Sequence, residues 1–250
     1  MQFYRKSPAI LVALMLLLWP GFVYADTVDL PVGAFSGSTV GKDFPAGWGP
    51  WILKNVKHQS VYSIVQDDSP VVMAKADGSA SGLMRDIEID PHKLPIITWR
   101  WKVAHGIEGS DIARKESNDS PARVYVAFAY DINRLGLLER LKYGAAKHIY
   151  SSSLPLRAIS YTWANETPKD SIVPMPYTAW FSQIVVENAG SPTNQWITEK
   201  RDVYEDYRKA FGEAPTGVTG VAIMTNTDNM GGHATAWYGD IVFKEKTLSN

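Results

Sequence analysis

The chain of 250 residues contains no cysteine. This absence excludes disulfides, a thiol nucleophile, an iron–sulfur cluster and lipid attachment through cysteine. A domain of this length can bury a sufficient core without cross-links. The sequence also lacks a G-x-S-x-G nucleophile elbow and a glycine-rich P-loop. Local motifs therefore indicate neither a serine hydrolase of that type nor a nucleotide-binding loop.

The five histidines are also uninformative as a group, because no pair has the H-x-x-x-H or H-x-H spacing of a local zinc motif. Ligands distant in sequence could still converge. We interpret each histidine as a surface or loop residue rather than a catalyst.

Long apolar runs are absent except at the N-terminus. Arg5 and Lys6 precede an apolar run over 9–19, Pro20 and Gly21 follow it, and Ala25 comes before Asp26. The run is too short to span a bilayer. We predict a signal peptide over residues 1–25 and a periplasmic or secreted mature protein. An uncleaved anchor is the alternative.

Charge of one sign is not concentrated in the chain. Without residues 1–25, which include two of the 25 basic residues, 23 basic and 26 acidic residues remain, a formal charge of −3. This balance indicates neither nucleic acid nor a charged membrane surface as a partner, and no membrane span is expected after signal cleavage. A glycan or another envelope component is the partner that we expect.

Strand patterns dominate residues 26–250. Short apolar runs alternate with Gly, Pro, Asp and Ser turns, and the runs include 61–65, 71–74, 83–89, 159–163, 181–187, 218–225 and 236–243. The pattern predicts one mainly β domain, an antiparallel, jelly-roll-like β-sandwich. One or two short helices are expected as insertions. The first lies within 133–150, where Leu135, Leu138 and Leu141 recur and should cap an end of the sandwich. The second covers 199–211 and ends before Gly212.

The centre of this pattern is the stretch 97–131, in which two strands flank a polar loop over 104–122. In the second strand, Val124, Val126 and Phe128 alternate with Arg123, Tyr125 and Ala127, so that the second set faces away from the main core. Small alanines beside Tyr125 and Arg123 leave room for a shallow groove. Arg100 and Arg123 need partners if they are buried. Arg123 either pairs with Asp119 or faces a ligand.

A second polar cluster, residues 225–233, follows a strand expected to be buried. Asn226 and Asp228 alternate there as calcium ligands often do, but a complete calcium loop is absent. A turn in which Asn and Asp bond their own backbone is the alternative. Calcium is thus the only cofactor that the sequence suggests.

The segments TWRWKV, NDSPARVYVAFAYD, ISYTWAN, DYRKAFGEAP and GVAIMTNTDNMGGHATAWYGDI occur in this order over 35–243. This set resembles a family of exported bacterial proteins of unknown function. The resemblance implies a periplasmic or secreted β-sandwich without assigned chemistry. WYGDI also resembles the last strand of galactose-binding-like carbohydrate-binding jelly rolls. The family pattern has two acidic residues where Asn118 precedes Asp119 here, which argues against a metal or acid role for this pair.

Three hypotheses follow. The first, which we favour, is a carbohydrate-binding module, and its candidate ligand-binding residues are Arg100, Asp119, Arg123, Tyr125, Tyr161 and Trp163. The second is a polysaccharide-cleaving enzyme on the same scaffold, with Asp119, Arg123, Tyr161 and Asp228 as candidates. Hydrolysis needs two carboxylates, and elimination by a lyase needs a tyrosine or histidine with a charge-neutralising arginine. The third is a non-enzymatic envelope assembly protein with an exposed apolar patch.

Overall fold

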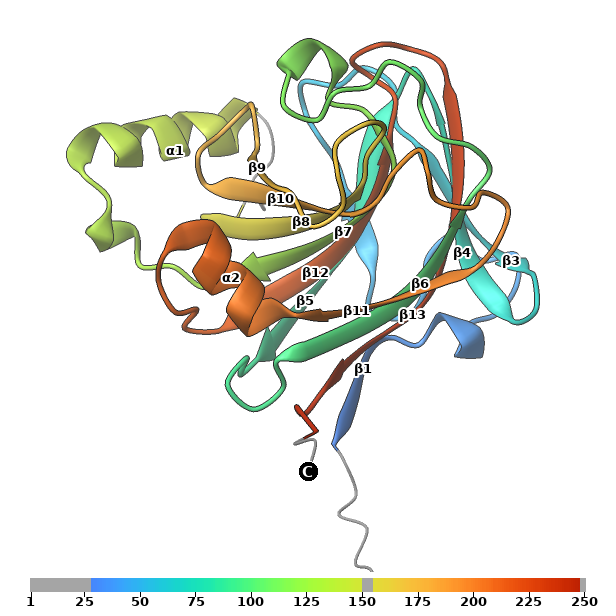
Figure 1. Cartoon of the computed structure of the whole chain (residues 1–250), viewed down its shortest axis with the longest axis horizontal. Coiled ribbons are helices and arrows are strands. Elements are labelled where there is room, and N and C mark those ends of the chain that lie inside the picture. The colour runs from blue at the N-terminus through green and yellow to red at the C-terminus, as the bar shows by residue number, and fades with distance from the viewer. Residues whose placement is uncertain (1–27, 150–154, 248–250) are drawn as a thin grey trace, which may run out of the picture.

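The computed structural model describes residues 28–149 and 155–247, and these residues form two packed sheets (Figure 1). The predicted signal peptide lies outside the described residues. Sheet A contains β1 (Asp29–Gly33), β3 (Val61–Gln66), β4 (Pro70–Asp77), β6 (Ile96–Val103), β11 (Ile197–Asp202) and β13 (His233–Lys244). Its order is β11-β6-β13-β4-β3, and β1 pairs with the far end of β13.

Sheet B contains β2 (Gly49–Trp51), β5 (Ala80–Ile89), β7 (Ser120–Phe128), β8 (Arg157–Trp163), β9 (Ile172–Pro174), β10 (Phe181–Glu187) and β12 (Val218–Asn226), in the order β2-β5-β12-β7-β8-β10-β9. The predicted β-sandwich is confirmed. Among the described strands one pairing departs from the antiparallel expectation, because β8 and β10 run parallel. Parallel neighbours need a crossover, and residues 164–180 supply it through β9.

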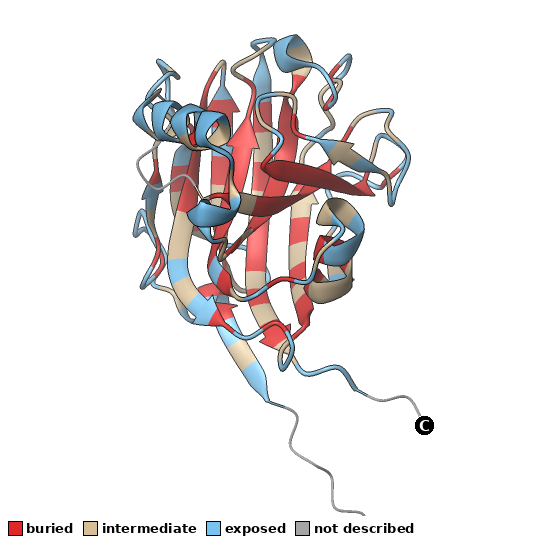
Figure 2. Ribbon diagram, turned by 90° about the vertical axis from the view of Figure 1, so that its left-hand side faces the viewer, coloured by how far each residue is buried: buried red, intermediate tan, exposed pale blue. Residues whose placement is uncertain are grey.

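The core lies between the sheets and is rich in aromatic side chains. Four aromatic residues, Trp99, Trp101, Tyr161 and Trp163, are buried there. The centroids of the rings that contact each other among them are 5.1–5.8 Å apart. Alternation explains this core, since the apolar members of β6 and the large members of β8 point to the same interior. In Figure 2 the buried residues follow the strands.

Strands β6 and β7 do not pair with each other. They lie in different sheets, and the loop between them, which includes the short helix η2 (Lys115–Ser117), crosses from sheet A to sheet B. The stretch 97–131 is therefore central to both sheets rather than a single hairpin. Two other one-turn helices are η1 (Phe35–Gly37) and η3 (Ile132–Arg134).

The two longer helices are α1 (Leu137–Ile149) and α2 (Val203–Phe211). α2 begins later than predicted, because residues 199–202 pair with β6 as part of β11 and the Asp202 side chain caps the helix by accepting from the Glu205 N–H at 3.1 Å. Its end at Gly212, with φ 72°, is as predicted. The expectation that leucines of the first helix cap the sandwich is wrong for Leu138 and Leu141, which are exposed. No helix of the described residues is long and apolar enough to cross a membrane.

Candidate functional site

The outer face of sheet B is lined by small side chains at its centre. Ala127 of β7 is opposite Ala158 of β8 and Gly220 of β12, and Ala222 is opposite Tyr125. These residues leave a depression in the face, in which two cavities of about 160 Å³ each are found. Trp51 and Tyr125 line both cavities, and their rings meet edge to face at 5.2 Å. We call the two cavities and this ring pair the sheet B groove.

Trp51 reaches the groove from the edge strand β2. It is opposite Gly82 of β5, and a Cβ at Gly82 would lie 2.7 Å from the Ile223 carbonyl oxygen and 3.1 Å from the Trp51 ring. Only glycine allows this approach, since Cβ contacts under 3.0 Å require a neighbour to shift. The position of the indole is thus determined by the sheet itself.

The first cavity has an apolar wall and a polar end. The wall consists of Trp51, Leu53, Val56, Met175, Trp180, Phe181 and Met224. The polar end consists of Asn55, Asn118, Arg123, Tyr177, Asp228 and Asn229 together with Asn226. The second cavity is lined mainly by Met84, Asp86, Ala127, Ala158, Gly220 and Ala222. An apolar cavity with a few convergent polar groups is the usual form of a small-ligand site.

Arg123 lies at the polar end with almost no exposed surface. Its guanidinium donates to Gln183 Oε1 at 2.6 Å, to Asn226 Oδ1 at 3.3 Å, and to the Asn118 carbonyl and Oδ1 at 3.1 and 3.0 Å. In the described part of the chain no carboxylate lies within ion-pair distance of it, so the Asp119–Arg123 pair considered from the sequence does not form directly. Neutral oxygens hold this cation in place.

Asp119 is fully buried beneath the same end of the cavity. Its Oδ1 accepts from Asn226 Nδ2 at 3.0 Å and from Asn229 Nδ2 at 2.9 Å, and its Oδ2 accepts from the Met230 N–H at 2.9 Å. Asn226 therefore lies between Asp119 and Arg123 and connects their opposite charges. Asp119 shapes the 225–233 turn and has no surface for a ligand.

Two titratable groups of the cavity are shifted. Burial, with the Asp119 charge as a smaller cause, raises the pKa of Asp228. Burial and the nearby Asp228 raise the pKa of Tyr177 to about 12, so that its hydroxyl stays protonated at neutral pH. That hydroxyl lies within hydrogen-bond distance of two acceptors, Asn229 Oδ1 and the Lys115 carbonyl, and its one proton can go to either. The cavity therefore presents hydroxyl, amide and carboxyl groups beside its aromatic wall.

One polar atom beside the cavity lacks a partner. The indole Nε1 of Trp51 is buried and has no hydrogen-bond partner among the described residues. A buried N–H without an acceptor costs about 1–3 kcal/mol.

Two predicted ligand-binding residues lie elsewhere. Tyr161 and Trp163 point from β8 into the core between the sheets and have no exposed surface. The Tyr161 hydroxyl donates to Asp206 of α2 at 3.0 Å, and burial raises its pKa well above the ordinary value. Both residues were predicted to contact a ligand. Their place in the core argues against that prediction, because a ligand on the outer face of sheet B cannot reach them.

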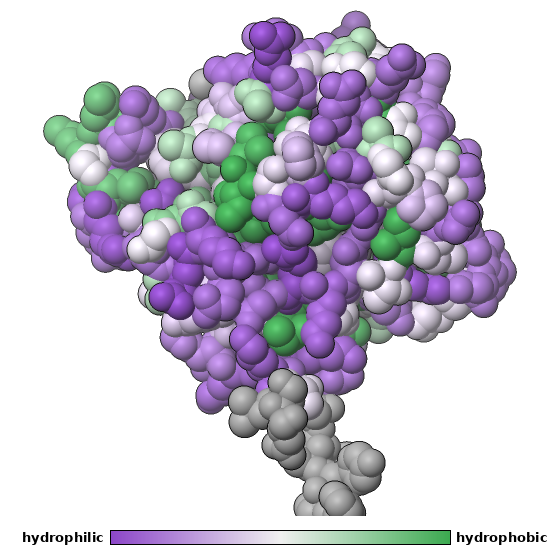
Figure 3. All heavy atoms as spheres, viewed as in Figure 1, coloured by the Kyte–Doolittle hydropathy of each residue, from purple (hydrophilic) through white to green (hydrophobic). Residues whose placement is uncertain are grey.

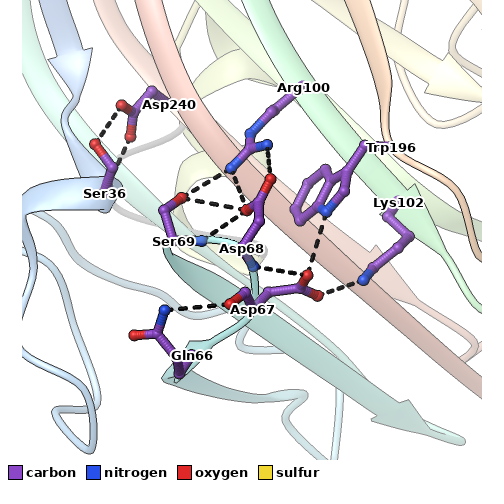
Figure 4. Close-up of polar contacts among 9 residues, drawn as sticks. All are labelled: Ser36, Gln66, Asp67, Asp68, Ser69, Arg100, Lys102, Trp196 and Asp240. Carbon is purple, nitrogen blue, oxygen red and sulfur yellow. Dashed lines mark hydrogen bonds and ion pairs between the residues drawn. The ribbon is translucent and has the colours of Figure 1, made fainter.

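Arg100 lies on the opposite side of the molecule, on the outer face of sheet A (Figure 4). It donates to both carboxylate oxygens of Asp68 at 2.5 and 2.7 Å and lowers the pKa of Asp68 to about 2. Its guanidinium also lies 4.4 Å from the Trp196 ring centroid, beside the Lys102–Asp67 pair. These contacts satisfy Arg100 within the protein. Of the predicted residues, the structure therefore brings together Arg123, Tyr125, Asn226 and Asp228, with Asp119 beneath them.

Calcium at Asn226 and Asp228 remains a prediction of the sequence. Asn226 Oδ1 accepts from Arg123, and its Nδ2 donates to Asp228 Oδ1 at 3.1 Å, so that an N–H rather than an oxygen faces the carboxylate. The described residues contain no group of three or more His, Cys, Asp or Glu side chains suited to a metal. This donor set does not fit a calcium site.

Sequence reasoning missed most of the cavity wall. Trp51 is far in sequence from Met175, Trp180 and Phe181, and no local pattern connects the two segments. Asn118 and Gln183, which hold Arg123, were also missed. The period-two alternation of β10 puts Gln183 on the same face as Phe181. This was the one sequence signal that could have identified Gln183 as a residue of the site.

Comparison with known proteins identifies the family. A family model described as "Protein of unknown function (DUF3047)" matches residues 46–242. The chain belongs to this family. The match includes all of the strands that form the groove and confirms the resemblance to an uncharacterised family. None of the curated proteins matches this chain in sequence.

Solved structures resemble it only distantly. The family 11 carbohydrate-binding module from Clostridium thermocellum, in complex with a β-1,3-1,4-mixed-linked tetrasaccharide, is 9% identical over 86% of this chain and 94% of that chain, with a TM-score of 0.39. The Emp47p carbohydrate recognition domain is 11% identical over 88% and 95%, with a TM-score of 0.40. Winged bean acidic lectin with methyl-α-D-galactose is 9% identical over 90% and 100%, with a TM-score of 0.37. Similarity at this level says nothing about the ligand of this chain.

Proposed function

We propose that this DUF3047 protein is exported and binds a carbohydrate or a similar uncharged polar ligand in the sheet B groove. Export is supported by the basic start, short apolar run and small residue before Asp26 in the sequence. Periplasmic or secreted location follows from the same segment.

The observation that carries the proposal is the composition of the first cavity. An aromatic and apolar wall matches the C–H faces of a sugar ring, and the Asn55, Asp228 and Asn229 side chains supply donors and acceptors for hydroxyl groups. Because the second cavity continues past Tyr125, the groove has room for more than one ring.

Binding is favoured over hydrolysis by the arrangement of the acids. Hydrolysis requires two carboxyl groups on either side of one bond, and Asp228 is the only carboxylic acid among the residues that line the first cavity. Asp119 is buried with both oxygens engaged, and Tyr161 lies in the core. Three of the four residues considered for an enzyme are thus close together, but they do not form an acid/base pair that faces a ligand.

A thermal-shift screen of residues 26–250 against soluble neutral oligosaccharides tests this proposal. A ligand at about a hundred times its dissociation constant adds roughly 2.7 kcal/mol, which raises the Tm of a domain of this size by roughly 5–10 °C. We expect at least one oligosaccharide to give this shift. A screen in which no saccharide moves the Tm contradicts the proposal.

Variants locate the binding. Asn55 is exposed and lines the cavity, whereas its neighbour Lys54 is exposed and does not. Asn55→Trp should obstruct the cavity and abolish the shift, and Lys54→Trp should leave it unchanged. Tyr177→Ala should weaken binding about tenfold, equivalent to about 1.4 kcal/mol of lost contact. Equal binding by Asn55→Trp and wild type would place the ligand elsewhere.

A further inference from the structure

The outward face of α1 is apolar, and no described residue covers it. Leu137, Leu138 and Leu141 are 77%, 64% and 64% exposed. The helical repeat of 3.6 residues places these three side chains on one face. The opposite face packs on the sandwich through Tyr143 and Ala146. Figure 1 shows α1 projecting beside sheet B, and in Figure 3 an apolar surface lies at the outer end of this helix.

Basic residues border this leucine face. The helical repeat places Arg140 and Lys147 along one side of it and Lys142 along the other. Residues 131–149 contain four basic and two acidic side chains, although the mature chain as a whole is net negative. Arg134 and Lys142 form ion pairs with Glu213 and Glu139, so the positive charge beside the leucines is that of Arg140 and Lys147. An apolar helix face with basic borders is the arrangement that binds the interface of a bilayer with anionic lipids.

We propose that α1 docks the protein onto the surface of a membrane that contains anionic lipids, with its three leucines in the boundary between headgroups and acyl chains. A second copy of the chain fits this face less well. A stable protein interface buries about 800 Å² on each partner, more than three leucine side chains provide. Two like-charged helix borders would also oppose each other across a symmetric contact.

Docking through α1 would bring the sheet B groove close to the membrane. Ala146 lines the first cavity, and Tyr143 meets Trp180 of the cavity wall edge to face at 5.2 Å. The helix therefore contacts the groove with one face and presents its leucines with the other. Membrane docking does not depend on the ligand proposed for the groove, and it can be measured without one.

Vesicle co-sedimentation of the mature protein tests the proposal. We expect binding to vesicles of phosphatidylethanolamine and phosphatidylglycerol at low salt, and at least tenfold weaker binding to phosphatidylcholine vesicles or in 0.5 M salt. The triple variant L137S/L138S/L141S should lose at least tenfold in partitioning. Val61→Ser is the matched control, because Val61 is 65% exposed on β3 of the other sheet and should not matter.

The leucines make few contacts, so the triple variant should keep the wild-type Tm within about 2 °C. A second measurement uses the absence of cysteine. Leu138→Cys labelled with an environment-sensitive dye should shift to the blue on anionic vesicles, whereas Val61→Cys with the same dye should not. Equal vesicle binding by the triple variant, or no shift at position 138, overturns the proposal. The proposal is also overturned if the wild-type protein does not bind vesicles but forms a concentration-dependent dimer that the triple variant does not form.

Discussion

Replacement of Glu199 by glutamine should stabilise the protein at alkaline pH and leave it unchanged at acidic pH. Glu199 of β11 accepts from Trp101 Nε1 at 3.2 Å and shares a hydrogen bond with Glu187 of β10. Glu187 also forms an ion pair with Lys169 at 2.6 Å. Burial, and then the charge of Glu187, raises the pKa of Glu199 to about 7.

The direction of the pH dependence follows from the linkage between proton binding and folding. A carboxyl whose pKa is higher in the folded than in the unfolded state stabilises the fold while it is protonated. This contribution is complete below about pH 4.5 and is lost as the pH rises to about 7. Each pKa unit corresponds to about 1.4 kcal/mol, so the rise of the Glu199 pKa from 4.5 to about 7 sets an upper bound of about 3.5 kcal/mol. Because Glu199 is only partly buried, solvent screening reduces the expected value to about 1–2 kcal/mol.

Glutamine imitates the protonated acid, since it can donate to Glu187 and still accept from Trp101. At pH 8, Glu199→Gln should therefore be more stable than wild type by about 1–2 kcal/mol, or roughly 2–8 °C in Tm. At pH 4.5 the two proteins should agree within about 0.5 kcal/mol. Urea denaturation at both pH values measures the difference, with Glu88→Gln on an exposed position of β5 as the control. A variant that is less stable at pH 8, or shifted equally at both pH values, would refute this reasoning.

Two further predictions concern the polar end of the cavity. Arg123→Lys should destabilise the fold by about 2–4 kcal/mol in urea denaturation, because one ammonium cannot satisfy Gln183, Asn118 and Asn226 together. A loss under about 1 kcal/mol would mean that the guanidinium contacts contribute little to stability. Calcium at 5 mM should change the Tm by less than about 1 °C relative to chelator, because Arg123 and amide N–H groups occupy the Asn226–Asp228 turn. A calcium-dependent rise of several degrees, lost in Asp228→Asn, would establish the metal site instead.

The fold could be predicted from the sequence where alternation was strong. The split of β7 into Val124, Val126 and Phe128 inside and Tyr125 outside agrees with the structure, because period two fixes opposite faces. Alternation does not identify the partner strand, so the sequence could not show that β6 and β7 belong to different sheets. The parallel β8–β10 pair was hidden for the same reason.

The site was predicted only in part. Arg123 and Tyr125 lie on β7, Asn226 ends the adjacent strand β12, and Asp228 follows in the next turn, so that local patterns were enough to suggest them. Trp163 was a predicted ligand contact, but it lies in the core because β8 turns its large residues inward and only small ones outward. The residues of the wall depend on tertiary contacts between distant segments, which no local pattern contains.

The leucines of 135–141 show a similar limit. Helical spacing correctly indicated a helix, and burial against the sandwich was the natural expectation for an apolar face. The structure instead buries the face with Tyr143, packs Leu135 against the sandwich and exposes Leu138 and Leu141. A single sequence cannot decide which of two faces packs on the protein when both carry apolar residues.

Indole NMR of ¹⁵N-tryptophan-labelled protein tests the groove most directly. Trp51 and Trp180 line the first cavity, whereas Trp196 and Trp237 lie on sheet A and are partly exposed. The protein is titrated with soluble neutral oligosaccharides, and Trp→Phe variants assign the Nε1–H signals. At least one saccharide should move the Trp51 and Trp180 signals and leave Trp196 and Trp237 in place. Titrations that move only Trp196 and Trp237, or none of the four, would contradict a ligand site in the sheet B groove.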